Sequence, residues 1–159
     1  MRRLCVMLLC RLTFLDAALM YLIDTNVVSE FRKIPTGKAD TMVVAWADSV
    51  DAADLYLSVI TVQELEIGVL LAERRDAAQG FVLRTWLEHY VIPAFTGRIL
   101  PVNLAVARRS ARLHVPDPKP VRDGLIAATA LVNGMTVVTR NVADFVATEV
   151  QLINPWVKF

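Results

Sequence analysis

The sequence has few cysteines and no excess of either charge. Cys5 and Cys10 are the only cysteines among its 159 residues. Two thiols near one end are too few for a disulfide framework or a thiolate metal site, so we expect a reducing compartment, the cytoplasm. The formal net charge is +1. The chain therefore lacks the overall basic character of many nucleic-acid-binding proteins, and any contact with RNA or DNA needs a local basic patch.

Long hydrophobic runs are also missing near the N-terminus. The apolar stretch from Leu4 to Cys10 has only about seven residues before Arg11, too few to cross a bilayer, and we expect no membrane association. With Arg2 and Arg3 before it, this stretch resembles a short signal peptide, which leaves secretion as an alternative. The simpler interpretation takes Met20 as the natural start. Residues 1–19 are then an extension or an extra packed segment, and residues 20–159 form one domain.

The remaining sequence alternates short apolar stretches with helical patterns. With 55% hydrophobic and 21% charged residues, the chain is typical of a globular protein. Five stretches predict strands: Tyr21–Ile23, Leu55–Ile60, Arg98–Val102, Met135–Thr139 and Gln151–Ile153. Six predict helices: Thr25–Arg32, Ala39–Val50, Val62–Glu73, Phe81–Tyr90, Leu104–Leu113 and Val121–Val132. This alternation predicts an α/β domain with a mainly parallel sheet.

Acidic residues follow several of the predicted strands. Asp24 comes directly after the first, Glu64 soon after the second and Asp144 soon after the fourth, while Asp123 begins an Ala-rich helix. In open α/β sheets, working residues lie beyond the carboxyl ends of the strands. Clustered carboxylates repel one another unless a proton or cation compensates them. Oxygen ligands of this kind suit Mg²⁺ or Mn²⁺, which indicates metal-dependent cleavage of a phosphodiester.

Each acid also has a purely structural interpretation. Asp24 is a natural helix cap. Thr61 and Glu64 have the spacing of a capping box, which alone would explain Glu64. Asp123 is favoured near a helix start by the helix dipole, and Asp144 fits a solvated loop. Their shared position at one predicted sheet edge, rather than any single residue, favours a site.

Four segments together resemble the PIN domain, and most of all the VapC and FitB type of toxin in bacterial toxin–antitoxin pairs. They are YLIDTNVVSE, SVITVQELEIG, RDGLIAATA and VVTRNVADF, in this order. The resemblance covers about residues 20–156. It implies an α/β/α sandwich with a parallel sheet and a ribonuclease that depends on Mg²⁺ or Mn²⁺.

The resemblance also assigns roles to individual residues. Asp24, Glu64 and Asp123 match the first three metal-binding acids of the family, and Asn26 matches the polar partner of the first. The fourth position is less regular, because many PIN domains carry an acid where this chain has Asn141. Either Asp144, or a water held by Asn141, then takes the fourth role.

Substrate and partner contacts complete the expectations. Thr139 and Asn141 are placed to hydrogen-bond a phosphate or to orient a ligand, and Arg140 lies next to the acids. Arg108 and Arg112 are four residues apart on one helical face and form a candidate RNA contact, with an ordinary solvated helix as the alternative. The resemblance implies a homodimer and a cognate DNA-binding antitoxin whose tail covers the acidic site. The three tryptophans lie among apolar residues, which indicates packing rather than base stacking.

Two other functions fit part of the pattern. A strand ending in Asp also opens phosphatases of the haloacid dehalogenase type, but these need a second Asp where this chain has Asn26. A binding module without catalysis, with the acids serving as helix caps, is the other alternative.

Overall fold

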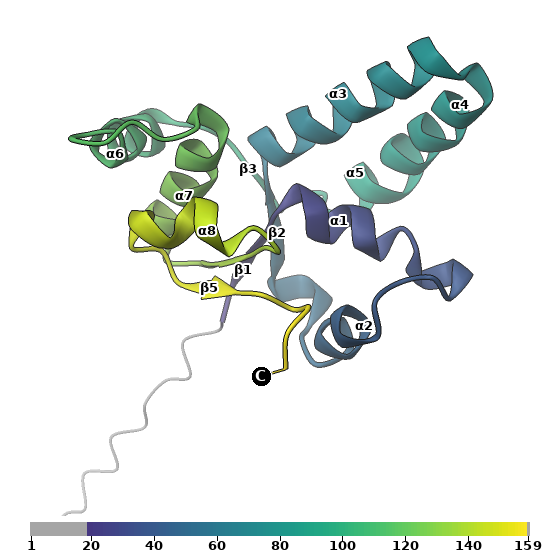
Figure 1. Cartoon of the computed structure of the whole chain (residues 1–159), viewed down its shortest axis with the longest axis horizontal. Helices are drawn as coiled ribbons and strands as arrows, with labels where there is room; N and C mark the ends of the chain where they lie inside the picture. Colours follow the sequence, from purple (N-terminus) through teal and green to yellow (C-terminus); the bar gives the residue numbers. More distant parts are fainter. Residues whose placement is uncertain (1–18, 159) are drawn as a thin grey trace, which may run out of the picture.

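The protein is built around one five-stranded parallel sheet. The computed structural model describes residues 19–158, with strand order β3-β2-β1-β4-β5 and every neighbouring pair parallel. The strands are β1 (Tyr21–Ile23), β2 (Leu55–Ser58), β3 (Ile99–Leu100), β4 (Thr136–Val138) and β5 (Leu152–Ile153). The first strand of the chain is thus the central one. Parallel pairing confirms the predicted sheet and brings the carboxyl ends of β1, β2 and β4 to one edge (Figure 1).

Helices cover both faces of the sheet. They are α1 (Thr25–Phe31), α2 (Thr41–Asp48), α3 (Val59–Arg75), α4 (Ala77–Trp86), α5 (Ile92–Ala94), α6 (Leu104–Leu113), α7 (Val121–Asn133) and α8 (Val142–Phe145). Shorter turns are η1 (Ile34–Thr36), η2 (Ala52–Asp54), the π-helical η3 (Leu87–Val91) and η4 (Val146–Thr148). Figure 1 shows α6, α7 and α8 on one side of the strands and α1 and α2 on the other.

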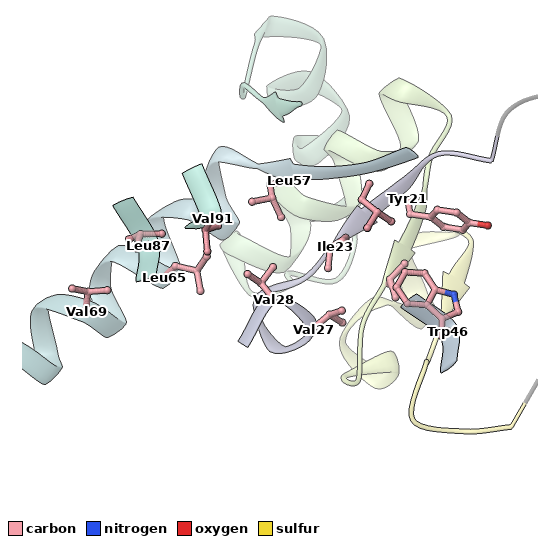
Figure 2. Packing of buried hydrophobic residues seen from close by; sticks show 12 residues of the cluster. Tyr21, Ile23, Val27, Val28, Trp46, Leu57, Leu65, Val69, Leu87 and Val91 are labelled. Carbon is pink, nitrogen blue, oxygen red and sulfur yellow. The ribbon is translucent and has the colours of Figure 1, made fainter. Parts of the chain in front are cut away.

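Alternate residues of each strand supply the two cores, as the period of a β-strand requires. Tyr21 and Ile23 of β1 pack on one face with the buried side chains of α1, α2, α3 and η3 (Figure 2). Leu22, between them, packs on the opposite face against α7 and α8, including Ile126 and Phe145. Both faces of the sheet are therefore buried under helices. This confirms the expected three-layer α/β/α sandwich.

The C-terminal part of α3 and all of α4 form a helical hairpin that projects from the sheet (Figure 1). Gly80 of α4 lies so close to α3 that a Cβ there would be 2.5 Å from the Cα of Glu73. Arg84 of α4 also forms ion pairs with two acids of α3. Its Nη1 is 2.6 Å from a Glu66 oxygen, and its Nε is 3.0 Å from a Glu73 oxygen. Close backbone approach and one shared arginine thus hold the two helices together.

Two predicted boundaries around β2 and α3 are wrong. The strand ends at Ser58 rather than Ile60, because the Ser58 hydroxyl accepts a hydrogen bond from the Ile60 N–H and caps α3. Thr61 is therefore inside the helix and fully buried, with its hydroxyl directed at the Ile23 carbonyl oxygen, 3.5 Å away. The capping-box interpretation of Glu64 fails, since Thr61 does not cap the helix.

The helix predicted to begin at Phe81 begins earlier. Asp76 accepts hydrogen bonds from the backbone N–H groups of Ala78 and Gln79, and so starts α4 at Ala77. After Trp86 the chain continues as the π-helical turn η3.

Apart from Leu19, the extension predicted over residues 1–19 lies outside the described residues.

Within residues 19–158, no helix combines the length and the apolar character needed to span a bilayer.

Candidate active site

Asp24 stands where β1 ends and α1 begins, and it is both a helix cap and a buried acid. One carboxylate oxygen, Oδ1, accepts a hydrogen bond from the Thr25 N–H at 2.8 Å. The other, Oδ2, accepts one from the Asn26 amide at 2.8 Å and one from the Thr139 hydroxyl at 2.7 Å. The capping interpretation is confirmed, and it is compatible with a further ligand because Oδ1 accepts only one hydrogen bond and retains a free lone pair.

Asn26 and Thr139 join the ends of the two central strands. The Asn26 amide nitrogen is 3.2 Å from the Thr139 hydroxyl, and its oxygen accepts a hydrogen bond from the Arg140 N–H at 3.1 Å. The Asn141 N–H donates to the Thr139 hydroxyl at 3.0 Å. Asn26 thus supports Asp24 through a hydrogen bond, and no second acid stands at position 26 as the phosphatase alternative requires.

Glu64 lies on the second turn of α3 and faces α1 and α7. The Thr25 hydroxyl donates to its Oε2 atom, and the Arg122 guanidinium lies 3.4 Å from its Oε1 atom. Neither partner was expected. Their positions in the sequence could have indicated that they belong to the site. Thr25 lies between Asp24 and Asn26, and Arg122 directly precedes Asp123.

The electrostatics show that the four acids share one region. Burial raises the pKa of Asp123 to about 6, with further upward contributions from Asp144, Asp24 and Glu64 and a downward one from Arg122. Burial also raises the pKa of Asp24, against its three hydrogen-bond donors, and the Glu64 charge adds to the rise. Asp144 itself is exposed on α8. The carboxylates of Asp24 at the end of β1, Glu64 on α3, Asp123 on α7 and Asp144 on α8 are therefore close enough for their charges to interact.

This donor set fits a hard divalent cation. Every candidate ligand is a carboxylate oxygen, and burial together with the charges of the other three acids raises the pKa of Asp123, a rise that a bound cation would oppose. In the described part of the chain, no three acidic, histidine or cysteine side chains already converge on one point. The Glu64 carboxylate contacts Thr25 and Arg122 instead. To bind an ion, it would have to give up one or both of these contacts.

The predicted RNA contacts are scattered around this edge. Arg140 is exposed next to the acids, with its guanidinium 5.4 Å from the centre of the Trp156 ring. Arg112 lines a pocket of about 270 Å³ that also includes Arg109 and Lys119, whereas Arg108 is exposed but does not line this pocket. An RNA contact at Arg108 and Arg112 therefore stays a prediction.

The tryptophans follow the predicted packing. Trp46 is buried, and Trp86 and Trp156 are half-buried against the same core. Trp86 and Trp156 each have in addition an arginine over the ring, Arg32 and Arg140 respectively.

Comparisons with known proteins agree with this geometry. Residues 21–149 match the PIN domain family. Toxin FitB of Neisseria gonorrhoeae is 42% identical over 86% of this chain and 99% of its own. A VapC ribonuclease of Sinorhizobium fredii is 39% identical over 86% of this chain and 98% of its own. The crystal structure of FitAcB from Neisseria gonorrhoeae superposes with a TM-score of 0.77 at 40% identity, covering 86% of this chain and 99% of that chain.

Proposed function

Because this chain belongs to the PIN-domain family and is similar over most of its length to FitB and VapC toxins, we propose that it is the toxin of a toxin–antitoxin pair. Its activity in this proposal is endonucleolytic hydrolysis of RNA, which inhibits translation and growth. The observation that carries the proposal is the raised pKa of Asp123 near the carboxyl edge of the sheet, which burial causes and to which the charges of Asp144, Asp24 and Glu64 add.

Asp24, Glu64 and Asp123 are the proposed ligands of Mg²⁺ or Mn²⁺, with Asp144 in an outer or second position. The ion supplies charge stabilisation at the scissile phosphate and lowers the pKa of a water nucleophile. The neighbouring residues prepare the site. Asn26 and Thr139 fix one oxygen of Asp24, which keeps its carboxylate in a single orientation.

Cationic side chains are placed at the rim of the same site. Arg122 on α7 contacts Glu64, and Arg140 follows Thr139 at the end of β4. Both are exposed, so both are available to a phosphate of the RNA. Such contacts position a nucleic acid without reading its sequence.

The proposed partners are a cognate antitoxin and a second copy of this chain. A similar chain has been solved as FitAB bound to a DNA fragment, which supports an antitoxin that also contacts DNA. A homodimer is supported by exposed apolar side chains on the projecting α3, where Ile67, Leu70 and Leu71 line a depression of about 570 Å³.

The deciding experiment replaces Asp24 by Asn. We expect purified wild-type protein to cleave RNA with Mg²⁺ or Mn²⁺, and Asp24→Asn to lose cleavage by several orders of magnitude while keeping its fold by circular dichroism. Induced expression should arrest growth only for the wild type. Asp48→Asn, an exposed acid at the end of α2, is the matched control and should behave as wild type. Cleavage that survives Asp24→Asn would refute the metal-nuclease proposal, and a wild type that neither cleaves RNA nor binds Mn²⁺ would favour a binding module.

A further inference from the structure

A small crevice opens directly beside the acids. It has a volume of about 200 Å³ and lies between α1, α3 and α4. Thr25 and Glu64 line the end that belongs to the active site, and Ser29, Arg32, Gly68 and Trp86 are among the residues that line the rest. The crevice is therefore continuous with the proposed site of phosphodiester hydrolysis.

Gly68 indicates that this space is kept open. It lies in the middle of the 17-residue helix α3, where glycine costs about 1 kcal/mol relative to alanine. A Cβ added at Gly68 would meet no atom within 4 Å, so no close packing explains the glycine. Gly80 is the contrasting case, because a Cβ there would collide with the backbone of α3. The absence of a side chain at position 68 leaves room in the crevice instead.

The walls have the chemistry that nucleobases bind. Thr25, Ser29 and Arg32 form a polar stripe at helical spacing along α1 and face the crevice. Across from them is the Trp86 ring, with the Arg32 guanidinium 5.6 Å from its centre. Proteins that bind single-stranded RNA stack bases on aromatic rings and on arginine planes, and hydrogen-bond the base edges. The crevice combines a tryptophan and an arginine with hydroxyl groups, and Leu65, Val69 and Leu83 complete its lining.

We propose that this crevice is a nucleobase subsite, which receives a base of the RNA next to the scissile phosphate. The inference rests on the proposed ribonuclease function and adds a determinant of substrate choice to it. The volume is below the range of about 300–1,000 Å³ typical of pockets for drug-sized ligands, and it suits one flat ring. Arg32 and Trp86 also line a second, more apolar pocket of about 390 Å³, together with Phe81, Val82 and Tyr90.

The test compares intact RNA with RNA from which single bases have been removed. A short oligonucleotide that the protein cleaves at one bond is synthesised with an abasic nucleotide at each position flanking that bond. The quantity measured is kcat/KM for wild type, Gly68→Leu and Gly68→Ala. Leucine fills the crevice, whereas alanine adds only a methyl group, so the two variants differ in how much of the crevice they fill.

We expect wild type to lose at least about fivefold in kcat/KM when one particular base is removed, the size of a lost stacking contact. Gly68→Leu should lose a similar factor on intact RNA and then be indifferent to removal of that base. Gly68→Ala should lose less than Gly68→Leu, because a methyl group fills less of the crevice. Trp86→Leu provides a second variant, with folding checked by thermal unfolding, and should likewise reduce the sensitivity to base removal.

Three results would overturn the subsite. The first is a wild type that cleaves every abasic RNA as well as the intact one. The second is a Gly68→Leu variant that keeps the full sensitivity to base removal. The third is a Gly68→Leu variant with unchanged cleavage and weakened inhibition by the antitoxin, which would make the crevice a peptide site. A wild type that cleaves no RNA would refute the proposed function itself, and the subsite with it.

Discussion

The carboxylate of Asp24 combines two roles that the sequence presented as alternatives. It caps α1 through Oδ1, and it is also buried and held by Asn26 and Thr139 through Oδ2. An acid with three hydrogen-bond donors would ordinarily have a low pKa, but burial and the nearby Glu64 outweigh the donors and raise it. The folded chain thus holds this charge at an energetic cost, which a bound cation would offset.

Replacing Thr139 by Val should test how firmly Asp24 is held. The variant keeps the shape of a fully buried side chain but removes the hydroxyl that donates to Asp24 and accepts from Asn141. We expect a loss of about 1–3 kcal/mol in the free energy of unfolding by urea, because buried polar groups lose their partner. The pKa of Asp24 should rise further, so Mn²⁺ affinity at neutral pH should fall.

Thr129→Val is the matched control. Its hydroxyl is also buried, but it bonds only to the Leu125 carbonyl within α7. The expected loss is under about 1 kcal/mol, since the helix itself supplies that carbonyl with a donor. Equal losses in the two variants would contradict a special role for the Thr139 network.

Asp123 predicts a pH dependence in the metal-free protein. Its pKa is about 6 in the folded chain, above the ordinary value of 3.8. Between these values the folded state binds more protons than the unfolded state, so stability falls as pH rises from about 4 to 6. Asp123 should contribute a decrease on the order of 1 kcal/mol in the free energy of unfolding over this pH range, after allowance for solvent screening. Asp123→Asn should remove that decrease.

The measurement is urea unfolding of wild type and Asp123→Asn at several pH values without divalent ions. Subtracting the free energy of unfolding of Asp123→Asn from that of wild type at each pH isolates the contribution of Asp123. The contribution of Asp24, whose pKa is also raised, is present in both proteins. Asp117→Asn, an exposed acid in the loop before α7, is the control and should follow wild type. A wild-type minus Asp123→Asn difference that does not change between pH 4 and 6 would contradict the raised pKa.

At the scale of single residues, the sequence pointed to acids whose charges affect one another, but not to the side chains that contact them. Asp24, Glu64, Asp123 and Asp144 could be placed at one edge because parallel strands align their carboxyl ends. The contacts of Glu64 with Thr25 and Arg122 depend on how α1, α3 and α7 pack, which no local pattern encodes.

At the scale of helices and strands, most elements were predictable because their apolar periodicity is strong. The errors fall at boundaries that are decided by one side chain. Ser58 ends β2 and starts α3 with a single hydrogen bond, although the residues that follow are β-branched and read as strand. Asp76 starts α4 in the same way, before its apolar pattern begins.

The two helical glycines on α3 and α4 should respond oppositely to alanine. Gly80→Ala places a methyl group against the α3 backbone, so the hairpin must open, with an expected loss of about 1–3 kcal/mol in the free energy of unfolding. Gly68→Ala meets open space and improves the helix, with an expected gain of about 0.5–1 kcal/mol. Chemical unfolding of both variants measures the two effects. A Gly80→Ala protein as stable as wild type would show that the hairpin adapts without strain.

At the scale of the whole molecule, the projecting hairpin predicts self-association. Leu71 is 61% exposed on α3, in the apolar depression that also includes Ile67 and Leu70. We expect wild type to form a dimer by light scattering and Leu71→Glu to shift toward monomer, because a charge in an apolar contact is costly. Leu104→Glu is the control, since Leu104 is 75% exposed at the start of α6, away from this depression. A Leu71→Glu protein that remains dimeric would place the dimer contact elsewhere.

The order of the strands has a consequence for how the protein is made. The central strand β1 leaves the ribosome first, but one of its two neighbours, β4, is synthesised late, and Thr139 lies 115 positions beyond its partner Asp24. A nascent chain that stops before β4 has neither the completed sheet nor Thr139 and Asp144. Any proposed toxicity therefore begins only after nearly the whole domain has been translated, and prematurely ended chains should be harmless to the cell that makes them.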